Sequence, residues 1–394
     1  MFTRIKRAWK TFRPYMQTRF IWSWPKQSQV LIYDSVNKEI LMEYSNPWSP
    51  EILYVRGEQV NMRVLLKSLS RSGRKTYNYV DCFIEKVKPR LIVTLLDNDW
   101  HFYTISQRHP EVKTLFLQNG WRVYSGLFQI LDNLQPEALR PFFVDHMLVF
   151  GPALSDKYSG YIKGNCVPVG SIKNNFVRKE KSHQKGVIAF LSQWRKTPGF
   201  NIEGKYFSHD EFFGQIDRLI IQFLIRYAEQ NKKRVMIIPS RDQQSEFPDH
   251  EKAYFRKILG QDLEFLEPEG SFSGYSAVDI AEVVVAVDTT LGYESIARGN
   301  KTAIFSIRST LLNLPDYKYG WPVDFADEGP FWTNNPAPDS FFRILDYLFE
   351  VEDEQWQRDL ESTNFSSLMS FNPGNTILKE ILEKELKAPP APEH

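Results

Sequence analysis

The feature that most constrains the fold is a series of short apolar runs alternating with amphipathic stretches. Runs such as RLIVTLLD, of about 4–8 residues, end in polar residues, as buried strands of a parallel sheet do. The stretches between them have helical spacing, most clearly over residues 210–231. The pattern predicts an α/β fold of βαβ units. We expect strands within residues 29–34, 90–97, 114–120, 146–151, 186–192, 234–240, 263–268, 278–290 and 302–307.

The series starts twice, which predicts two domains. A chain of 394 residues exceeds one ordinary core, and a polar stretch separates the two series. The expected parts are a basic aromatic leader (1–26), an N-terminal domain (27–177), a linker (178–185), a C-terminal domain (186–385) and a disordered tail (386–394).

The leader is rich in Trp, Phe and cationic residues and has no acidic residue. Its aromatic residues interrupt any apolar core, so it does not resemble a signal peptide. It fits either contact with an anionic membrane surface or a loosely packed basic segment. No apolar run is long enough to span a membrane. Its cations are Arg4, Lys6, Arg7, Lys10, Arg13, Arg19 and Lys26.

Composition narrows the functional classes. A net charge of +1 argues against a nucleic-acid partner, which would favour a basic excess. The two cysteines, Cys82 and Cys166, are far apart and lack metal-ligand spacing. We therefore expect no disulfide framework, no metal site and a reducing, cytoplasmic location, at the inner face of the inner membrane if the leader binds lipid.

The segment VVVAVDTTLGYESIARGNKTAIFS, which starts at residue 283, is the most informative one. A predicted strand ends before Thr289 and Thr290, and a helix follows. Amides at such a helix start, together with the two hydroxyls and Gly292, can bind a phosphate. Glu294 can then accept hydrogen bonds from a ribose. The alternative is an N-cap at Thr289 or Thr290, a capping box at Glu294 and a packing glycine at Gly292.

This segment resembles "D-S/T-T-L-G-Y-E-A-x-A-R-G-K-K" in the C-terminal domain of GT-B-type transferases of bacterial surface-carbohydrate biosynthesis. That family is distantly similar to capsule and sialyl-type transferases. VTLLDNDWHFYTIS, TLFLQNGWR, VPVGSIKNN and IAFLSQWR resemble further segments of the family. The resemblance covers roughly residues 90–310.

The resemblance implies a GT-B fold, with two Rossmann-like domains whose parallel sheets face a central cleft. The C-terminal domain would hold a nucleotide sugar, with Thr289, Thr290 and Gly292 at the donor phosphate and Glu294 at the ribose. No cofactor or metal is implied, because helix-end amides offset the charge of the leaving phosphate. Asp97-Asn98-Asp99 has the letters of a metal-binding motif, but it lies in the segment that resembles the acceptor side.

Transfer with inversion needs a base for the acceptor hydroxyl. Asp97 and Asp99 follow a predicted strand, and Asp97 is preferred because it comes directly after the apolar run. The alternative is a helix cap or an Asx turn at Asp97-Asn98. His101 and His109 are weaker candidates.

Further polar residues follow neighbouring strands. Arg122 can bind a carboxylate or phosphate through its planar guanidinium, unless Asn119-Gly120 is a tight turn that leaves Arg122 exposed. In the second domain, IIPSRDQ stands where sialyl-type transferases have a His-Pro pair, and this departure removes the expected acid. The candidates for acceptor or sugar contact are Asn98, Gln118, Asn119, Gly120 and Arg122; those for the donor nucleotide include Ser192, Gln193, Arg195, Ser240 and Arg241.

The leading hypothesis is a glycosyltransferase of capsule, lipopolysaccharide or another surface glycan. The resemblance permits a CMP-linked keto-acid sugar or a diphosphate donor, and a glycan or lipid-linked glycan acceptor. The alternatives are a polyol-phosphate transferase, a sugar-nucleotide epimerase, or a catalytically silent GT-B-like scaffold.

Overall fold

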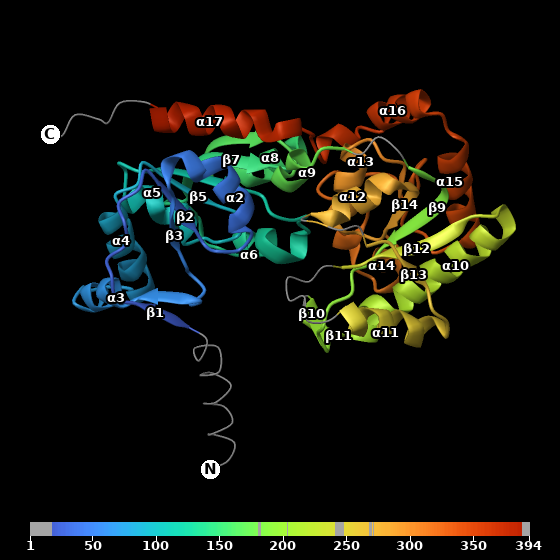
Figure 1. Cartoon of the computed structure of the whole chain (residues 1–394), viewed down its shortest axis with the longest axis horizontal. Helices are drawn as coiled ribbons and strands as arrows, with labels where there is room; N and C mark the ends of the chain where they lie inside the picture. The colour runs from blue at the N-terminus through green and yellow to red at the C-terminus, as the bar shows by residue number, and fades with distance from the viewer. Residues whose placement is uncertain are drawn as a thin grey trace, which may run out of the picture.

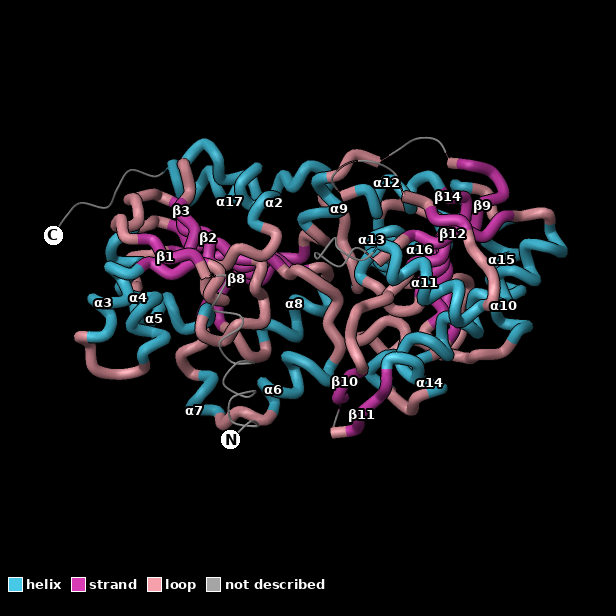
Figure 2. Tube along the Cα trace, turned by 60° about the horizontal axis from the view of Figure 1, so that its bottom comes forward, coloured by secondary structure: helices cyan, strands magenta, loops and turns pink. Residues whose placement is uncertain are grey.

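The computed structural model describes residues 18–179, 183–202, 204–240, 248–267, 270 and 272–387. Expectations that concern residues 1–17, the middle of the linker (180–182), Arg241 and residues 388–394 lie outside this range. The described chain forms two lobes that lie side by side, each around one parallel sheet (Figures 1 and 2).

The N-terminal lobe holds a six-stranded sheet in the order β3-β2-β5-β6-β7-β8, with every pair parallel. The central strands are buried, as their apolar runs predict. The order reverses between β2 and β5, which makes their carboxyl ends a topological switch point. The strands are β2 (Val30–Tyr33), β3 (Glu51–Leu53), β5 (Leu91–Thr94), β6 (Lys113–Leu117), β7 (Phe143–Val149) and β8 (Lys163–Pro168).

Helices cover both faces of this sheet, and a short parallel pair, β1 (Arg19–Ile21) and β4 (Gln59–Asn61), lies beside it. Asn61 caps α3, because its side chain accepts a hydrogen bond from the amide of Val64. The helices are α2 (Lys38–Ser45), α3 (Met62–Leu69), α4 (Lys75–Val87), α5 (Ile105–Arg108), α6 (Gln129–Asp132), α7 (Pro136–Leu139), α8 (Pro152–Ser159) and α9 (Ile172–Phe176).

The C-terminal lobe holds a second six-stranded parallel sheet, in the order β13-β12-β9-β14-β15-β16. Its order reverses between β9 and β14, as in a Rossmann domain. The strands are β9 (Gln184–Leu191), β12 (Arg234–Ile238), β13 (Glu264–Phe265), β14 (Ala281–Ala286), β15 (Thr302–Phe305) and β16 (Trp332–Thr333), and a hairpin joins β10 (Gly199–Ile202) to β11 (Lys205–Ser208).

The long helix expected over residues 210–231 is α10 (Gln215–Asn231), preceded by a π-helical turn at Asp210–Gly214. The other helices of this lobe are α11 (Pro248–Leu259), α12 (Ser273–Ile280), α13 (Thr290–Ala297), α14 (Arg308–Leu311), α15 (Pro338–Glu350) and α16 (Asp353–Ser362). Short turns lie at Asn46–Trp48, Phe102–Thr104, Tyr124–Phe128, Pro315–Tyr317, Phe365–Ser367 and Pro373–Asn375.

The last helix, α17 (Thr376–Lys387), returns to the N-terminal lobe (Figure 1). Leu378, Leu382 and Leu386 recur every fourth residue and pack in one buried cluster with residues of β2, β5 and β6. The C-terminal lobe therefore ends before α17, although residues up to 385 were expected in it. Likewise β9 starts at Gln184, inside the expected linker.

The carboxyl ends of the two sheets face each other. Trp121 lies in the loop after β6, and its amide donates to Oγ1 of Thr290 at the start of α13, at 2.9 Å. The rings of Trp121 and Tyr293 are stacked, with centroids 3.8 Å apart and planes at 6°. The loops after the strands, where α/β proteins bind ligands, thus meet between the lobes. Within the described ranges, no helix is both long and apolar enough to cross a bilayer.

Candidate functional site

A cavity of about 840 Å³ lies at the switch point of the N-terminal sheet. One part of its wall is apolar, with Val60, Leu65, Leu127 and Leu131. The polar part comes from the ends of β2 and β5 and from the loop after β3, with Tyr33, Arg56, Asn98, Asp99 and His101. An apolar pocket with a few converging polar groups has the composition of a small-molecule site.

Asp99 and His101 form a dyad in this wall. The Nδ1 atom of His101 lies 3.0 Å from Oδ1 of Asp99, and the His101 amide donates to the same oxygen at 2.9 Å. The Tyr33 hydroxyl donates to Oδ2 at 2.8 Å, and burial together with the Asp99 charge raises the pKa of Tyr33. This geometry favours the imidazole tautomer with a proton on Nδ1, which leaves the Nε2 lone pair available. No hydrogen bond to Nε2 comes from the described residues.

Arg56 and Asp34 form a second polar feature that sequence reasoning missed. Asp34 directly follows β2, is buried, and adopts a positive φ of 86°. Burial raises the pKa of Asp34, while the Arg56 guanidinium, whose Nε lies 3.0 Å from Oδ2, lowers it. Arg56 is half exposed and lines the cavity, so its charge can contact an anionic group. The available signal was the position of Asp34 at the polar end of the strand predicted over residues 29–34.

Asp97, the preferred base, lies outside the cavity lining and is fully buried. Its carboxylate accepts hydrogen bonds from Arg122 Nε at 2.8 Å, from the Tyr158 hydroxyl at 2.6 Å and from the Asn119 amide at 3.2 Å. Burial opposes the charge of Arg122, but Asp97 holds the pKa of Arg122 above its ordinary value. Two expectations are corrected: Asp97 has no access to a substrate proton, and Arg122 binds Asp97 instead of a ligand.

The side chains of Gln118 and Asn119, in the loop after β6, form hydrogen bonds with other groups of the protein. Gln118 accepts from the Phe150 amide at 2.9 Å and donates to the Gly120 carbonyl at 3.0 Å. The side-chain oxygen of Asn119 accepts from Lys173 at 3.2 Å. Of the predicted acceptor-side residues, Asn98 and Asp99 line the cavity.

In the C-terminal lobe, the start of α13 fits the capping alternative. Thr289 is the N-cap, and its Oγ1 accepts from the Gly292 amide at 2.9 Å. A Cβ atom on Gly292 would lie 2.6 Å from Cβ of Ala286, so the glycine is required by packing. Thr290 accepts from Trp121. A hydroxyl that accepts a hydrogen bond still has a proton to donate, so both threonines keep the capacity to bind phosphate.

Glu294 does not face a ligand site. It is buried between the lobes, where Oε1 accepts from the Tyr275 hydroxyl at 3.0 Å and its carbonyl oxygen accepts from Asn174 at 3.1 Å. Burial raises the pKa of Glu294, while Ser171 and the positive charge of Lys173 lower it. The expected ribose contact is therefore corrected, because protein groups enclose this carboxylate.

Gln193 lies at the switch point of the C-terminal sheet, within a buried network that sequence reasoning missed. Its Oε1 accepts from Arg308 at 2.8 Å, and Asp288 forms an ion pair with the same guanidinium. Ser192 is buried and accepts from the Trp194 amide at 3.1 Å. The Ser240 amide donates to Glu251 at 2.9 Å.

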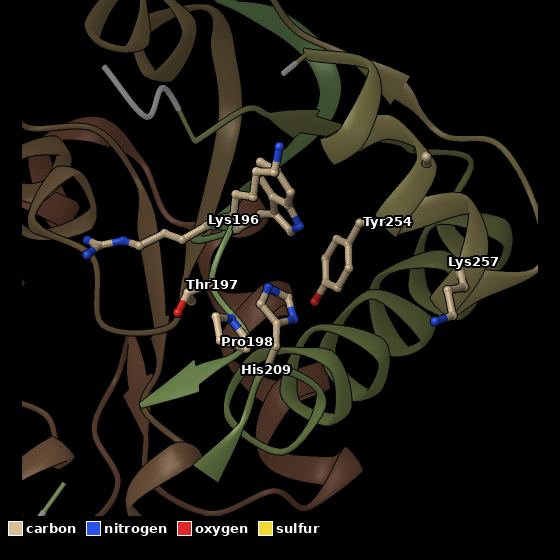
Figure 3. Close-up of a pocket in the computed structure, with 9 residues that line it drawn as sticks. Lys196, Thr197, Pro198, His209, Tyr254 and Lys257 are labelled. Atoms are coloured by element: carbon tan, nitrogen blue, oxygen red, sulfur yellow. The ribbon is translucent and has the colours of Figure 1, made fainter. Parts of the chain in front are cut away.

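A hollow of about 430 Å³ lies beside the end of β9 (Figure 3). Figure 3 shows the rings of His209 and Tyr254 next to each other in its lining. The Nε2 atom of His209 is shielded from solvent and has no hydrogen-bond partner among the residues that the structure describes, and burial lowers the pKa of His209. Arg195, Lys196 and Lys257 line the hollow and make it cationic.

The buried carboxyl group of Asp217, which contacts Tyr254 of this hollow, should make the stability of the protein depend on pH. It is fully buried, accepts from the Tyr254 hydroxyl at 2.7 Å, and burial raises its pKa from 3.8 to about 7. The native state thus binds this proton more tightly than the unfolded chain, and stability falls as pH rises from about 4 to about 7. Asp217→Asn should therefore raise the Tm at pH 8 by about 3 °C or more relative to the wild type, and by less at pH 5.

Thermal unfolding of the wild type and of Asp217→Asn at pH 5 and pH 8 measures how the Tm shift depends on pH. An equal Tm shift at pH 5 and pH 8 would show that Asp217 is ionised in the folded state at both.

A model of the protein family described as "putative O-antigen biosynthesis protein" matches residues 115–386. The chain belongs to this family. The family description agrees with the expected class, surface-carbohydrate biosynthesis, and the match does not extend to sialyl-type transferases. No curated protein matches the chain.

Solved structures resemble the chain in fold. The wall teichoic acid polymerase TagF has a TM-score of 0.50 at 9% identity, over 91% of this chain and 89% of that chain. A TagF variant soaked with CDPG has a TM-score of 0.50 at 8% identity, with the same coverage. UDP-GlcNAc 2-epimerase from Neisseria meningitidis, bound to UDP-GlcNAc, has 0.49 at 10% identity, over 90% of this chain and 99% of that chain. The TagF likeness and the two six-stranded parallel sheets confirm the expected GT-B fold.

Proposed function

We propose that the chain is a glycosyltransferase that moves a sugar from a nucleotide-activated donor to a glycan or lipid-linked glycan acceptor in O-antigen synthesis. The observation that carries the proposal is the Asp99–His101 dyad in the wall of the N-terminal cavity. The cavity lies at the edge of the N-terminal sheet that faces the C-terminal lobe. An acceptor bound in the cavity would therefore face a donor bound at the carboxyl ends of β9 and β14.

His101 is the base and Asp99 positions it. The acceptor hydroxyl gives its proton to Nε2 of His101, while the acceptor oxygen forms a bond to the anomeric carbon of the donor. The bond from that carbon to the phosphate oxygen breaks, and a single displacement inverts the configuration. Asp99 holds Nδ1 and stabilises the imidazolium that forms, the role of the acid in a Ser-His-Asp triad.

The donor binds in the C-terminal lobe without a metal or a further cofactor. The start of α13, with the hydroxyls of Thr289 and Thr290, provides donors for the phosphate. Arg195 and Lys196 add positive charge beside β9, and Arg241 is a further candidate. These groups offset the charge that develops on the leaving phosphate. The cationic groups also accommodate the carboxylate of a CMP-linked keto-acid sugar.

Calorimetry with CMP, CDP, UDP and GDP tests the donor site. We expect one nucleotide to bind with a Kd below ~1 mM, equivalent to about −4 kcal/mol. Thr290→Val should weaken that binding, because the hydroxyl proton is lost, whereas Thr363→Val, at the end of α16, should not. If no nucleotide binds at millimolar concentration, the donor proposal fails.

The alternative activities differ in what they consume. An epimerase would convert its nucleotide sugar without an acceptor, and a polyol-phosphate transferase would move a phosphate together with its alcohol. A catalytically silent scaffold would convert no nucleotide sugar, with or without an acceptor. Incubation of each candidate donor with and without acceptor, followed by product analysis, separates these cases.

A further inference from the structure

We propose that the N-terminal lobe docks on an anionic phospholipid bilayer through a face formed by β1, the segment after it, and α3. Large apolar side chains are exposed there, with Trp22 at 61% and Leu66 at 56%. Clustered exposed apolar side chains of this size mark interaction sites in soluble proteins. The β1–α3 face is defined by Phe20, Trp22, Trp24, Leu66 and Leu69.

Contacts join these residues into one surface. β1 pairs with β4, where Phe20 lies opposite Val60, and α3 begins directly after β4. The guanidinium of Arg63 on α3 lies 5.8 Å from the ring centroid of Trp24. Leu66 is one helical turn from Arg63, and Leu69 is one turn further. Figures 1 and 2 both place α3 beside β1 at the same end of the lobe.

The charge on this face favours a lipid surface of negative sign. Lys86 lies 4.4 Å from the Trp24 ring centroid, on the side of α4. Arg19, Lys26 and Arg63 are exposed. Of the nearby acids, Glu85 is paired with Lys67 and Arg71. Glu58 is exposed and accepts from Ser35.

Tryptophan rings flanked by cations match the chemistry of the bilayer interface. The rings can lie at the depth of the headgroups while the cations contact lipid phosphates. In the sequence, residues 1–17 add five more cations and no acid immediately before β1. A neutral protein partner would leave this excess of positive charge unpaired, whereas an anionic bilayer engages both the cations and the exposed apolar side chains.

Docking in this way would place the cavity next to the bilayer. Val60 and Leu65, from β4 and α3, belong to the cavity wall, and the exposed Leu66 follows Leu65. A lipid-linked acceptor could then reach His101 from the membrane. This consequence rests on the proposed function, whereas the docking itself does not.

Vesicle sedimentation of the full chain tests the docking. Vesicles of phosphatidylcholine alone are compared with vesicles that also contain one quarter phosphatidylglycerol, in 0.1 M NaCl. We expect the wild type to sediment with the anionic vesicles, and the triple variant Trp22→Ser, Leu66→Ser, Leu69→Ser to partition at least ~10-fold more weakly. Binding should also fall in 0.5 M NaCl, because salt screens the cations.

The matched control is the double variant Tyr206→Ser, Leu311→Ser in the C-terminal lobe. The two replaced residues are 55% and 45% exposed, respectively. It should bind vesicles as the wild type does. Circular dichroism should show both variants folded, because all replaced side chains are exposed.

The proposal is overturned if the wild type does not prefer anionic vesicles, or if the triple variant binds them as tightly as the wild type. It is also overturned if, in sedimentation velocity without vesicles, the wild type is a dimer and the triple variant is a monomer. The β1–α3 face would then join two copies of the chain. A failure of the transferase proposal would leave these vesicle measurements unchanged.

Discussion

Asp99→Asn should slow sugar transfer by ~10²–10⁴-fold while leaving nucleotide binding within about twofold, because it removes the charge that orients and stabilises the His101 imidazole. The measurement is the initial rate of nucleotide release with saturating donor and acceptor. Stability should change little, since the Asp99 side chain is partly exposed and asparagine can still accept from Tyr33.

The control for this prediction is a double-mutant cycle. His101→Ala alone should lose as much activity as Asp99→Asn, and the double variant should lose no more than the His101 variant, because the two residues act as one unit. Independent, multiplicative losses would contradict a dyad and would point to Asp99 acting on the substrate directly.

The second large effect concerns stability. Arg122→Ala should lower the free energy of unfolding by ~3–5 kcal/mol, because it leaves the carboxylate of Asp97 buried without its charge partner. Urea denaturation measures the change. The matched control is Arg140→Ala. Arg140 and its partner Glu137 are both largely exposed, so this change should cost no more than ~1 kcal/mol.

The same variant separates two roles for Arg122. A folded Arg122→Ala protein with nearly wild-type stability and no transfer would show that the guanidinium contacts a substrate. That result would restore the prediction made from the sequence and would contradict the buried ion pair.

The central strands of both sheets were predictable because their burial on two faces requires continuous apolar runs, as in β5 and β14. The edge strands β3, β8 and β16 were not predicted, and in β8 the segment KGNCVP is largely exposed and polar. The amphipathic pattern of α17 indicates that the helix covers an apolar surface. It does not indicate which of the two sheets provides that surface, and in the structure it is the N-terminal one.

The sequence predicted which loop carries the candidate site, but it did not predict the role of each residue in that loop. Polar residues directly after a buried strand placed Asp97 and Asp99 at the edge of the sheet. Their different roles depend on partners distant in sequence, since Tyr158 encloses Asp97 and Tyr33 holds Asp99 at the cavity. Glu294 illustrates the same limit, because the Tyr275 hydroxyl that engages it comes from another helix.

The most direct test of the proposed transferase is nucleotide release from a panel of CMP-, CDP-, UDP- and GDP-linked sugars, with and without O-antigen acceptor, for the wild type, Asp99→Asn and His101→Ala. We expect nucleotide release that requires the acceptor and gives an inverted linkage in the product. Both variants should lose this release while still binding the nucleotide. Acceptor-dependent release that is equally fast in wild type and variants, or conversion of a donor without any acceptor, would contradict the proposed activity.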